Sequence, residues 1–334
     1  MTYKRKPIMG LLYGEATGIG SELVVKSLHE AEVRESATWV LIGDERVFQQ
    51  GALIAGKPLH YKKANNIEEV KQEKADVWLL DTSNTDPASI ELGKLSVESG
   101  QATGETLTFA TKLAQNNKLD GVVYAPLNKD ALYKGGFQFE DDIHLLASLF
   151  GYESGFGEVN VMEDLWVTRA TSHIPLKEVA KYINKERVLE VIEFANEVVT
   201  KAGLTQPKIV VAALNPHAGD GGLIGMEEIE EINPAVQAAQ EKGINVEGPY
   251  PADTIFLRQK TNPFDCLVAM YHDQAQTGMK LMGFHKGVTI NGGLPIVLNT
   301  PAHGTAFDIA GKGIANTGAM IHAMKLGVRM VLNQ

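Results

Sequence analysis

Short apolar runs alternate along the chain with longer segments whose apolar positions recur every three or four residues. Short runs of this kind are typical of buried β-strands, and the longer spacing is typical of amphipathic α-helices that cover a sheet. In the first part of the chain, the strands predicted from this pattern are Ile8–Tyr13, Trp39–Ile42, Val77–Leu80 and Gly121–Ala125. The helices predicted between them are Ser21–Glu30, Glu45–Gln50 and Thr103–Ala114.

The later part repeats the alternation. Ile209–Ala213 and Cys266–Tyr271 are predicted strands, and Lys185–Ala202 and Glu227–Lys242 are predicted helices, the second followed by Gly243 at the usual place of a C-cap glycine. Strands that alternate with helices predict a parallel or mixed α/β sheet, whose ligands bind in the loops beyond the carboxyl ends of the strands. Here these loops are Gly14–Gly20, Pro126–Lys129, Asn215–Gly225 and His272–Lys280.

Length and composition narrow the class of protein. A chain of 334 residues is expected to form two domains. The net charge of -10 argues against nucleic acid as the main partner, because phosphate binding needs a basic surface. Cys266 is the only cysteine, which excludes an intrachain disulfide and a thiolate zinc site. The sequence has no apolar stretch long enough to span a membrane, so we expect a cytoplasmic protein.

The first glycine-rich loop, Gly14-Glu-Ala-Thr-Gly-Ile-Gly20, follows a predicted strand and opens a predicted helix. Its spacing differs from the dinucleotide fingerprint G-x-G-x-x-G, and the sequence contains no phosphate-binding G-K-[ST] motif. A phosphate turn and a tight turn that needs positive φ explain these glycines equally well.

Three histidines stand in short polar loops at the ends of strand-like runs: His173, His217 and His272. If these strands are neighbours, the three imidazoles meet at one edge of the sheet, where they would form a catalytic metal site of the zinc type. Asp220 and Asp273 are candidates to orient the rings. Each histidine alone is explained as well by a hydrogen-bonded loop residue, and the spacing along the chain is not itself a metal signature.

Two further polar residues are candidates for contact with an acidic substrate. Lys280 lies eight residues beyond His272 and would bind a carboxylate or phosphate, although an exposed lysine is the more common explanation. Asp253 is the second candidate, and is explained equally well as the N-cap of the helix that follows it.

The motifs together resemble the 4-hydroxythreonine-4-phosphate dehydrogenases of pyridoxal phosphate biosynthesis and their paralogues. The matching segments run nearly from end to end: Gly14–Glu22, Ala125–Lys129, Ser172–Leu176, Leu214–Gly219, Pro251–Thr254, Tyr271–Gln274 and His303–Gly311. The resemblance implies two α/β/α domains with a cleft between them, like isocitrate and isopropylmalate dehydrogenases. We expect one domain from residues 1–130 plus 290–334, and a second from 131–289 that carries the metal histidines and dimer contacts.

The resemblance also implies a homodimer with a shared active site and a divalent metal (Zn, Mg, Mn or Co) on His173, His217 and His272. It implies NAD or NADP as cofactor, held by residues that the sequence does not identify, and places Asp253 and Lys280 at the substrate. Departures from the family pattern fall on the substrate set: Asp142-Ile143 replaces His-Thr, Leu298 replaces an arginine and Thr289 an asparagine. Losing the arginine removes donors suited to phosphate, and Asp142 adds repulsion.

These residues predict a metal-dependent NAD(P) dehydrogenase that oxidises a secondary alcohol of a small hydroxy acid, related to 4-phosphooxy-threonine, with decarboxylation of the 3-keto acid. The expected substrate-binding positions are Lys280, Thr289, Asp142 and Leu298. Two alternatives are a metal-dependent hydrolase or lyase on the same scaffold, which would act without nicotinamide, and a binding protein that has lost turnover.

Overall fold

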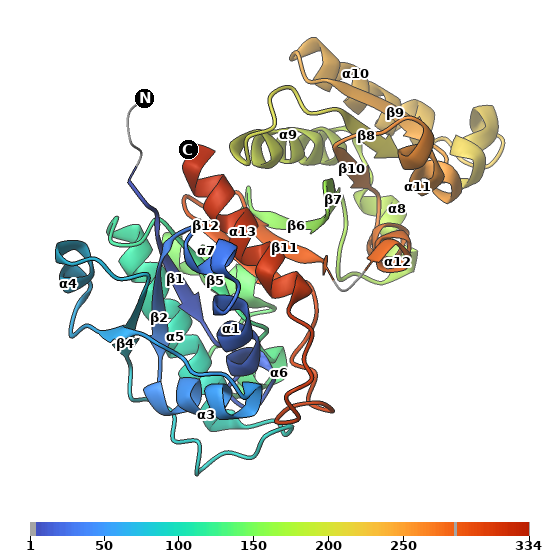
Figure 1. The fold of residues 1–334 in the computed structure, drawn as a ribbon. Coiled ribbons are helices and arrows are strands. Elements are labelled where there is room, and N and C mark those ends of the chain that lie inside the picture. The colour runs from blue at the N-terminus through green and yellow to red at the C-terminus, as the bar shows by residue number, and fades with distance from the viewer. Residues whose placement is uncertain (1–4, 284–285, 334) are drawn as a thin grey trace. The chain divides into compact units, whose positions relative to one another are not determined.

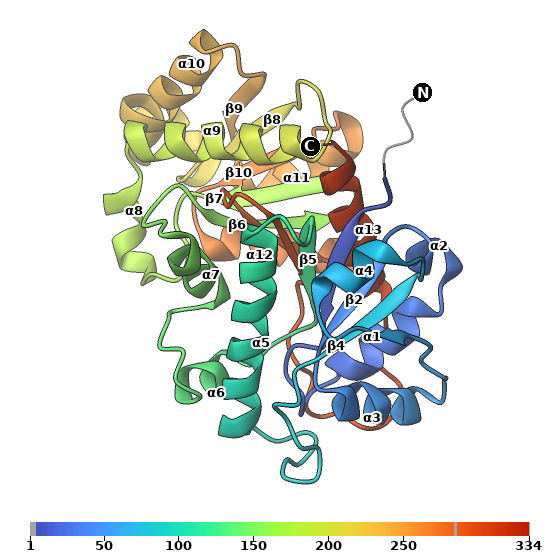
Figure 2. The same ribbon diagram turned by 90° about the vertical axis from the view of Figure 1, so that its left-hand side faces the viewer.

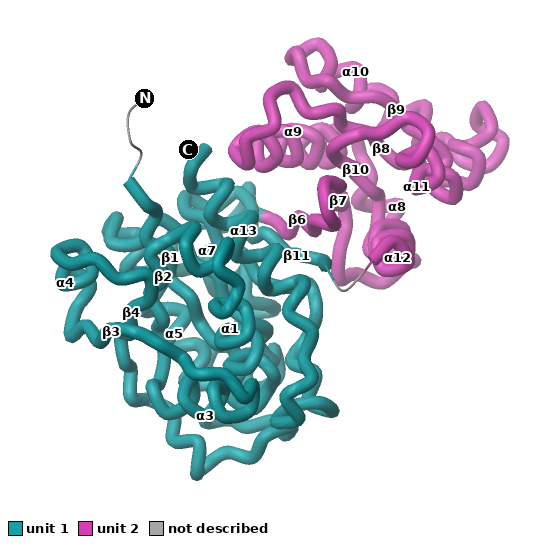
Figure 3. Tube along the Cα trace, viewed as in Figure 1, with its two compact units in different colours: residues 1–156, 285–334 teal, residues 157–284 magenta. Residues whose placement is uncertain are grey.

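The computed structural model describes residues 5–283 and 286–333 (Figure 1). The chain divides into two compact units: unit 1 comprises Met1–Phe156 with His285–Gln334, and unit 2 comprises Gly157–Phe284 (Figure 3). Residues 131–156, expected in the second domain, therefore belong to unit 1. The physical reason is packing, since Ile143, Leu145 and Leu146 join the buried cluster that Leu107 and Ala110 help to form.

Unit 1 is built on a mostly parallel sheet of strand order β3-β4-β2-β1-β5-β12-β11. Neighbouring strands run parallel except β11 and β12, which pair antiparallel. The strands are β1 (Ile8–Leu12), β2 (Thr38–Gly43), β3 (Lys62–Lys63), β4 (Val77–Asp81), β5 (Gly121–Tyr124), β11 (Val288–Gly292) and β12 (Val297–Pro301).

Helices cover both faces of this sheet (Figure 2). Leu107 and Ala110 bury one side of α5 against one face, and Gly327 brings α13 against Met9 and Val123 on the opposite face. The helices are α1 (Gly20–Leu28), α2 (Ala31–Arg34), α3 (Glu45–Ala55), α4 (Ile67–Gln72), α5 (Val97–Gln115), α6 (Lys129–Lys134), α7 (Asp142–Phe150) and α13 (Gly318–Asn333).

Unit 2 has a sheet of order β6-β7-β10-β8-β9, in which only β6 and β7 pair antiparallel. Its strands are β6 (Gly157–Met162), β7 (Leu165–Arg169), β8 (Ile209–Ala212), β9 (Val246–Tyr250) and β10 (Cys266–Ala269). The longer helices are α9 (Lys185–Lys201), α10 (Asn233–Glu241), α11 (Ala252–Thr261) and α12 (His272–Gly283). Shorter turns are η1 (Leu176–Glu178), α8 (Val179–Tyr182), η2 (Pro216–Gly222) and the π-helical turn η3 (Glu228–Ile232).

The predicted α/β class is confirmed, and each predicted strand corresponds to an observed one. The prediction of a loop at His272–Lys280 is wrong. This segment lies in α12, which buries Ala275 and Met279 at helical spacing. Gly243 has the left-handed φ of 84° expected just after a helix. Within the described residues, no helix has the length and apolar character needed to cross a membrane.

Candidate active site

The three candidate metal histidines follow three adjacent parallel strands of unit 2. β10 pairs with β7 on one side and with β8 on the other, both in parallel. His173 follows β7 after a short loop, His217 lies in η2 beyond β8, and His272 begins α12 beyond β10. Because parallel strands end at the same edge, the fold brings all three segments to one edge of the sheet.

Two of these rings are neighbours. The ring centroids of His173 and His272 lie 5.8 Å apart, which is close enough for two imidazoles to share one ion at about 2 Å per ligand bond. Asp273 Oδ1 lies 2.7 Å from His272 Nδ1, as predicted for an orienting carboxylate. Across residues 5–283 and 286–333, however, no three His, Cys, Asp or Glu side chains are arranged to hold one metal ion. The donor chemistry fits a metal, and the described geometry provides two of the three imidazoles.

The loop that carries His217 has an unusual backbone. His217, Ala218 and Asp220 all have positive φ, at 54°, 56° and 45°, and so do the glycines at 219 and 221 between and after them. The left-handed region typically costs a non-glycine residue of order 1–3 kcal/mol. Such strain persists only where surrounding contacts impose it, so the conformation of His217 is set by its neighbours.

Those contacts come from a residue that the sequence did not indicate. Glu228, the first residue of η3, is only 1% exposed, and its carboxylate accepts hydrogen bonds from the loop that leads into η2. A buried glutamate has no signature in a single sequence, although a π-helical turn often marks a functional region.

Asp253 and Lys280 lie on separate helices of unit 2. Asp253 is exposed in the first turn of α11, which begins without a side-chain cap, so the N-cap alternative is wrong. Lys280 is exposed in α12, eight residues after His272, and therefore roughly 12 Å along the axis at 1.5 Å per residue. The helices touch where Gly278 packs on the ring of Phe256. The described contacts do not place either side chain at the histidine pair.

Asp142 belongs to a buried polar cluster in unit 1. It is 7% exposed and accepts a hydrogen bond from the hydroxyl of Tyr124, which in turn accepts one from Asn291 Nδ2 at 2.6 Å. Lys129 Nζ lies 4.0 Å from Asp142 Oδ1. Thr289 lies two residues before Asn291 on β11, on the same face of that strand. Asp142 is thus linked to β11 through Tyr124 and Asn291, two residues that the sequence pattern does not indicate, and Thr289 lies on the same strand as Asn291.

Leu298 does not line a pocket. It is 0% exposed on β12 and lies in the hydrophobic core of unit 1, in the same cluster as Ile143 and Leu294. The expectation that Leu298 contacts substrate is therefore wrong in this structure, because resemblance locates a position along the chain without showing what surrounds it. Ile143 and Leu298, two of the positions that depart from the family pattern, are both apolar side chains in the same buried cluster.

The glycine loop after β1 is closed by the protein's own backbone. A Cβ on Gly14 would lie 2.2 Å from the carbonyl oxygen of Ala125, and a Cβ on Gly20 would lie 1.8 Å from that of Tyr13. Gly14 also has a φ of 65°. Of the two explanations for this loop, the tight structural turn is the one that the geometry supports.

Glu15 lies buried in this same loop. The hydroxyl of Thr17 donates to Glu15 Oε1 at 2.9 Å, whereas Oε2 has no hydrogen-bond partner among the described residues. Burial raises the pKa of Glu15, and hydrogen bonds from Ser99 and Thr17 offset only part of this effect.

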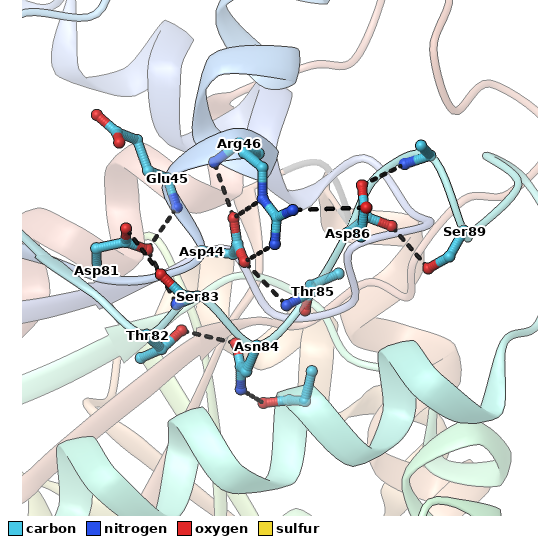
Figure 4. Close-up of polar contacts among 12 residues, drawn as sticks. Asp44, Glu45, Arg46, Asp81, Thr82, Ser83, Asn84, Thr85, Asp86 and Ser89 are labelled. Atoms are coloured by element: carbon cyan, nitrogen blue, oxygen red, sulfur yellow. Dashed lines mark hydrogen bonds and ion pairs between the residues drawn. The ribbon is translucent and has the colours of Figure 1, made fainter.

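A second polar network lies at the carboxyl ends of β2 and β4 (Figure 4). Asp44, directly after β2, accepts hydrogen bonds from Arg46 Nε at 3.0 Å and Nη2 at 2.9 Å, and from Thr85 N at 2.9 Å. Burial raises the pKa of Asp44, but these bonds outweigh it and the net pKa is lowered. In dinucleotide-binding folds an acidic residue at this point holds the ribose. Here its oxygens are already satisfied, so the network serves the fold.

Comparison with known proteins agrees with the motifs. The family model of the pyridoxal phosphate biosynthetic protein PdxA matches residues 35–327. The chain belongs to this family. It is 39% identical over 328 residues to the D-threonate 4-phosphate dehydrogenase of Cupriavidus necator, covering 97% of both chains.

Solved structures give the same result over the whole fold. A 4-hydroxythreonine-4-phosphate dehydrogenase from Burkholderia phymatum is 37% identical, covering 98% of this chain and 99% of its own, with a TM-score of 0.81. One from Klebsiella pneumoniae is 32% identical, covering 99% of both, with a TM-score of 0.85. These PdxA relatives are named as dehydrogenases, so the predicted family and its oxidoreductase class are confirmed.

Proposed function

We propose that this chain is an NAD(P)-dependent dehydrogenase that oxidises the secondary alcohol of a small hydroxy acid and requires a divalent metal ion. The observation that carries the proposal is the placement of His173, His217 and His272 beyond three adjacent parallel strands, with two rings 5.8 Å apart. Relatives of nearly the same length that are named as dehydrogenases support the reaction class.

His173, His217 and His272 would hold the divalent metal ion (Zn, Mg, Mn or Co). When bound, the metal supplies Lewis acidity to the substrate hydroxyl, and the nicotinamide of NAD or NADP supplies the hydride acceptor. Asp273 would keep the ring of His272 in one orientation through its 2.7 Å contact with Nδ1. The nicotinamide would bind without a Rossmann-type turn, because the Gly14–Gly20 loop is filled by backbone.

Lys280 would bind the carboxylate of the substrate, and Asp253 would position or accept a proton. If that carboxylate is β to the new ketone, its loss as CO2 leaves a carbon that must gain a proton. An exposed acid in the first turn of a helix keeps contact with solvent and can exchange such a proton. Oxidation to the 3-keto acid followed by decarboxylation is therefore the proposed sequence.

The substrate's remote end would differ from a phosphate. Asp142, an expected substrate position in unit 1, is a buried carboxylate that accepts a hydrogen bond from Tyr124, and Leu298, where the family pattern has an arginine, lies in the core. A buried carboxylate repels a phosphate dianion and favours a hydroxyl or ammonium group. We propose Asp142 and Thr289 as the residues that select an uncharged or cationic end of the hydroxy acid.

The active form would be a homodimer. The segment after the His217 loop exposes four apolar side chains close together in sequence, and two of them, Met226 and Ile229, lie against Gly222, where a Cβ would come within 2.7 Å and 3.4 Å of them. These four exposed residues, Leu223, Ile224, Met226 and Ile229, form an apolar patch. A second copy of the chain that covers this patch would explain its exposure beside the loop of His217. Light scattering of the purified protein measures the mass directly, and a monomer at all concentrations would refute this part.

A substrate screen tests the proposal. The purified chain, stripped with a chelator and reloaded with one metal at a time, is incubated with NAD or NADP and pairs of phosphorylated and free hydroxy acids. We expect metal-dependent reduction of the nicotinamide with a free acid, release of CO2, and loss of both in His272→Ala. Metal-dependent turnover without any nicotinamide would instead support a hydrolase or lyase.

A further inference from the structure

The strained loop around His217 is held by two adjacent carboxylates, of which the buried one, Glu228, accepts the backbone hydrogen bonds, while Glu227 Oε2 accepts one from Asn215 Nδ2 at 2.7 Å. Glu228 Oε1 accepts hydrogen bonds from the backbone N–H of Leu214 at 2.8 Å and of Asn215 at 2.7 Å. Its other oxygen, Oε2, accepts one from Asn215 Nδ2 at 3.0 Å. All three donors lie in the two residues that lead into η2, so Glu228 holds the backbone where the chain enters the left-handed turn and shares the side chain of Asn215 with Glu227.

The same carboxylate also lies against the turn itself. A Cβ on Gly219 would come within 2.7 Å of Glu228 Oε2, so only glycine leaves room for the carboxylate at this point. Glu228 is 1% exposed and begins the π-helical turn η3. A charged group this deeply buried is retained only where its hydrogen bonds satisfy it, and here its partners are all in the His217 loop.

We propose that Glu228 is a positioning residue, which holds the backbone of the loop from Leu214 to Gly222 so that His217 faces its site. This inference rests on the proposed function, because it assigns His217 a ligand to orient toward. Glu228 would act without touching substrate or metal, because the hydrogen bonds that it accepts come from Leu214 and Asn215. Its effect passes through Asn215 and Gly219 to the histidine.

Three variants separate this role from a general loss of stability. Glu228→Gln keeps the shape and can still accept from Leu214 N and Asn215 N. Its amide NH2 would, however, face Asn215 Nδ2, donor against donor. Glu228→Ala removes all three hydrogen bonds that the Glu228 carboxylate accepts. The matched control is Glu230→Gln, which removes the same charge from an exposed position in the same π-helical turn.

The first measurement is hydrogen exchange of the full-length protein without metal. In Glu228→Gln we expect the amides of residues 214–222 to exchange at least tenfold faster than in the wild type. The amides of β8 and β10 should stay protected, which shows that unit 2 remains folded. Glu230→Gln should match the wild type throughout. Unchanged exchange at 214–222 in both Glu228 variants would overturn the inference, whatever the metal data show.

The second measurement is titration with Co²⁺ alone, followed by its visible absorption. Loss of a residue that orients a metal ligand typically weakens affinity by 10–100-fold, and we expect about this loss in Glu228→Gln. The double variant Glu228→Gln/His217→Ala should bind no more weakly than His217→Ala, because a residue that acts only through His217 has no further effect once the imidazole is gone.

The outcomes distinguish the inference from the proposed function. Faster loop exchange with unchanged Co²⁺ affinity in Glu228→Gln, or additive losses in the double variant, would overturn the positioning role and leave the proposed metal site standing. Failure of the wild type to bind Co²⁺, or an affinity unaffected by His217→Ala, would overturn the proposed metal site and the positioning role with it.

Discussion

Introducing at position 298 the arginine that the family resemblance implies there tests whether Leu298 belongs to the core or to a substrate pocket. Leu298 is 0% exposed within a cluster that includes Ile143, Leu294 and Val122. Replacing it with arginine loses the burial of one leucine, about 1.5–3 kcal/mol, and places a charge in an apolar core without a built partner, about 3–5 kcal/mol. We therefore expect Leu298→Arg to destabilise unit 1 by about 4.5–8 kcal/mol.

A loss of that size is a large part of the 5–15 kcal/mol typical of a whole domain, so Leu298→Arg should unfold at a much lower urea concentration than the wild type, or be unfolded without urea. The assay is urea unfolding followed by tryptophan fluorescence, since Trp39 and Trp78 are both buried in unit 1. Leu298→Met, which conserves volume, should stay within about 1.5 kcal/mol of the wild type.

The reasoning would be refuted by a Leu298→Arg protein with the wild-type unfolding midpoint. It would also be refuted by a folded variant that gains affinity for a phosphorylated hydroxy acid. Either result would mean that position 298 opens onto the substrate, and that the chain keeps a phosphate pocket that one substitution restores.

Further predictions concern buried groups. Because burial raises the pKa of Glu15 above its usual 4.5, the folded protein binds more protons than the unfolded chain between the two values, and its stability falls as pH rises through that window. Glu15→Gln should therefore gain melting temperature relative to wild type as the pH rises above the usual 4.5, and a difference that stays constant with pH would contradict this. In Gly20→Ala the new Cβ would lie 1.8 Å from Tyr13 O, so the free energy of unfolding measured with urea should fall by about 1–3 kcal/mol. Gly304→Ala, which places its Cβ in open space, should lower it by less than about 0.5 kcal/mol. Cys266 is buried and its pKa is raised by that burial, so a thiol reagent should label it only after unfolding; rapid labelling of the native protein would show the core to be open.

Much of the fold could be predicted because buried parallel strands are continuous apolar runs. β2 and β10 are of this kind. The apolar pattern does not predict β11 and β12, because these strands contain Asn, Gly and Pro although all of their residues are buried. The pattern predicts a loop in place of α12 because this segment has few apolar residues, although Ala275 and Met279 have helical spacing.

The site was partly predictable for a topological reason. Histidines at the ends of strands can be expected at one edge once the strands are parallel neighbours, and this holds for the segments of all three. What a sequence does not contain is the surroundings of a side chain. It therefore could not show that Leu298 is buried, that Tyr124 holds Asp142, or that Glu228 supports the loop of His217.

Unit 1 is assembled from two distant pieces of chain, and this sets the order in which the protein can fold during its synthesis. β12 pairs with β5 beside the centre of the sheet, and α13 covers Met9 and Val123. Until these last segments leave the ribosome, the nascent protein has an unpaired strand edge and an uncovered apolar face. Unit 2 is one continuous stretch and can fold earlier. Chaperone contact during translation should therefore fall on the first 156 residues and end only when α13 emerges.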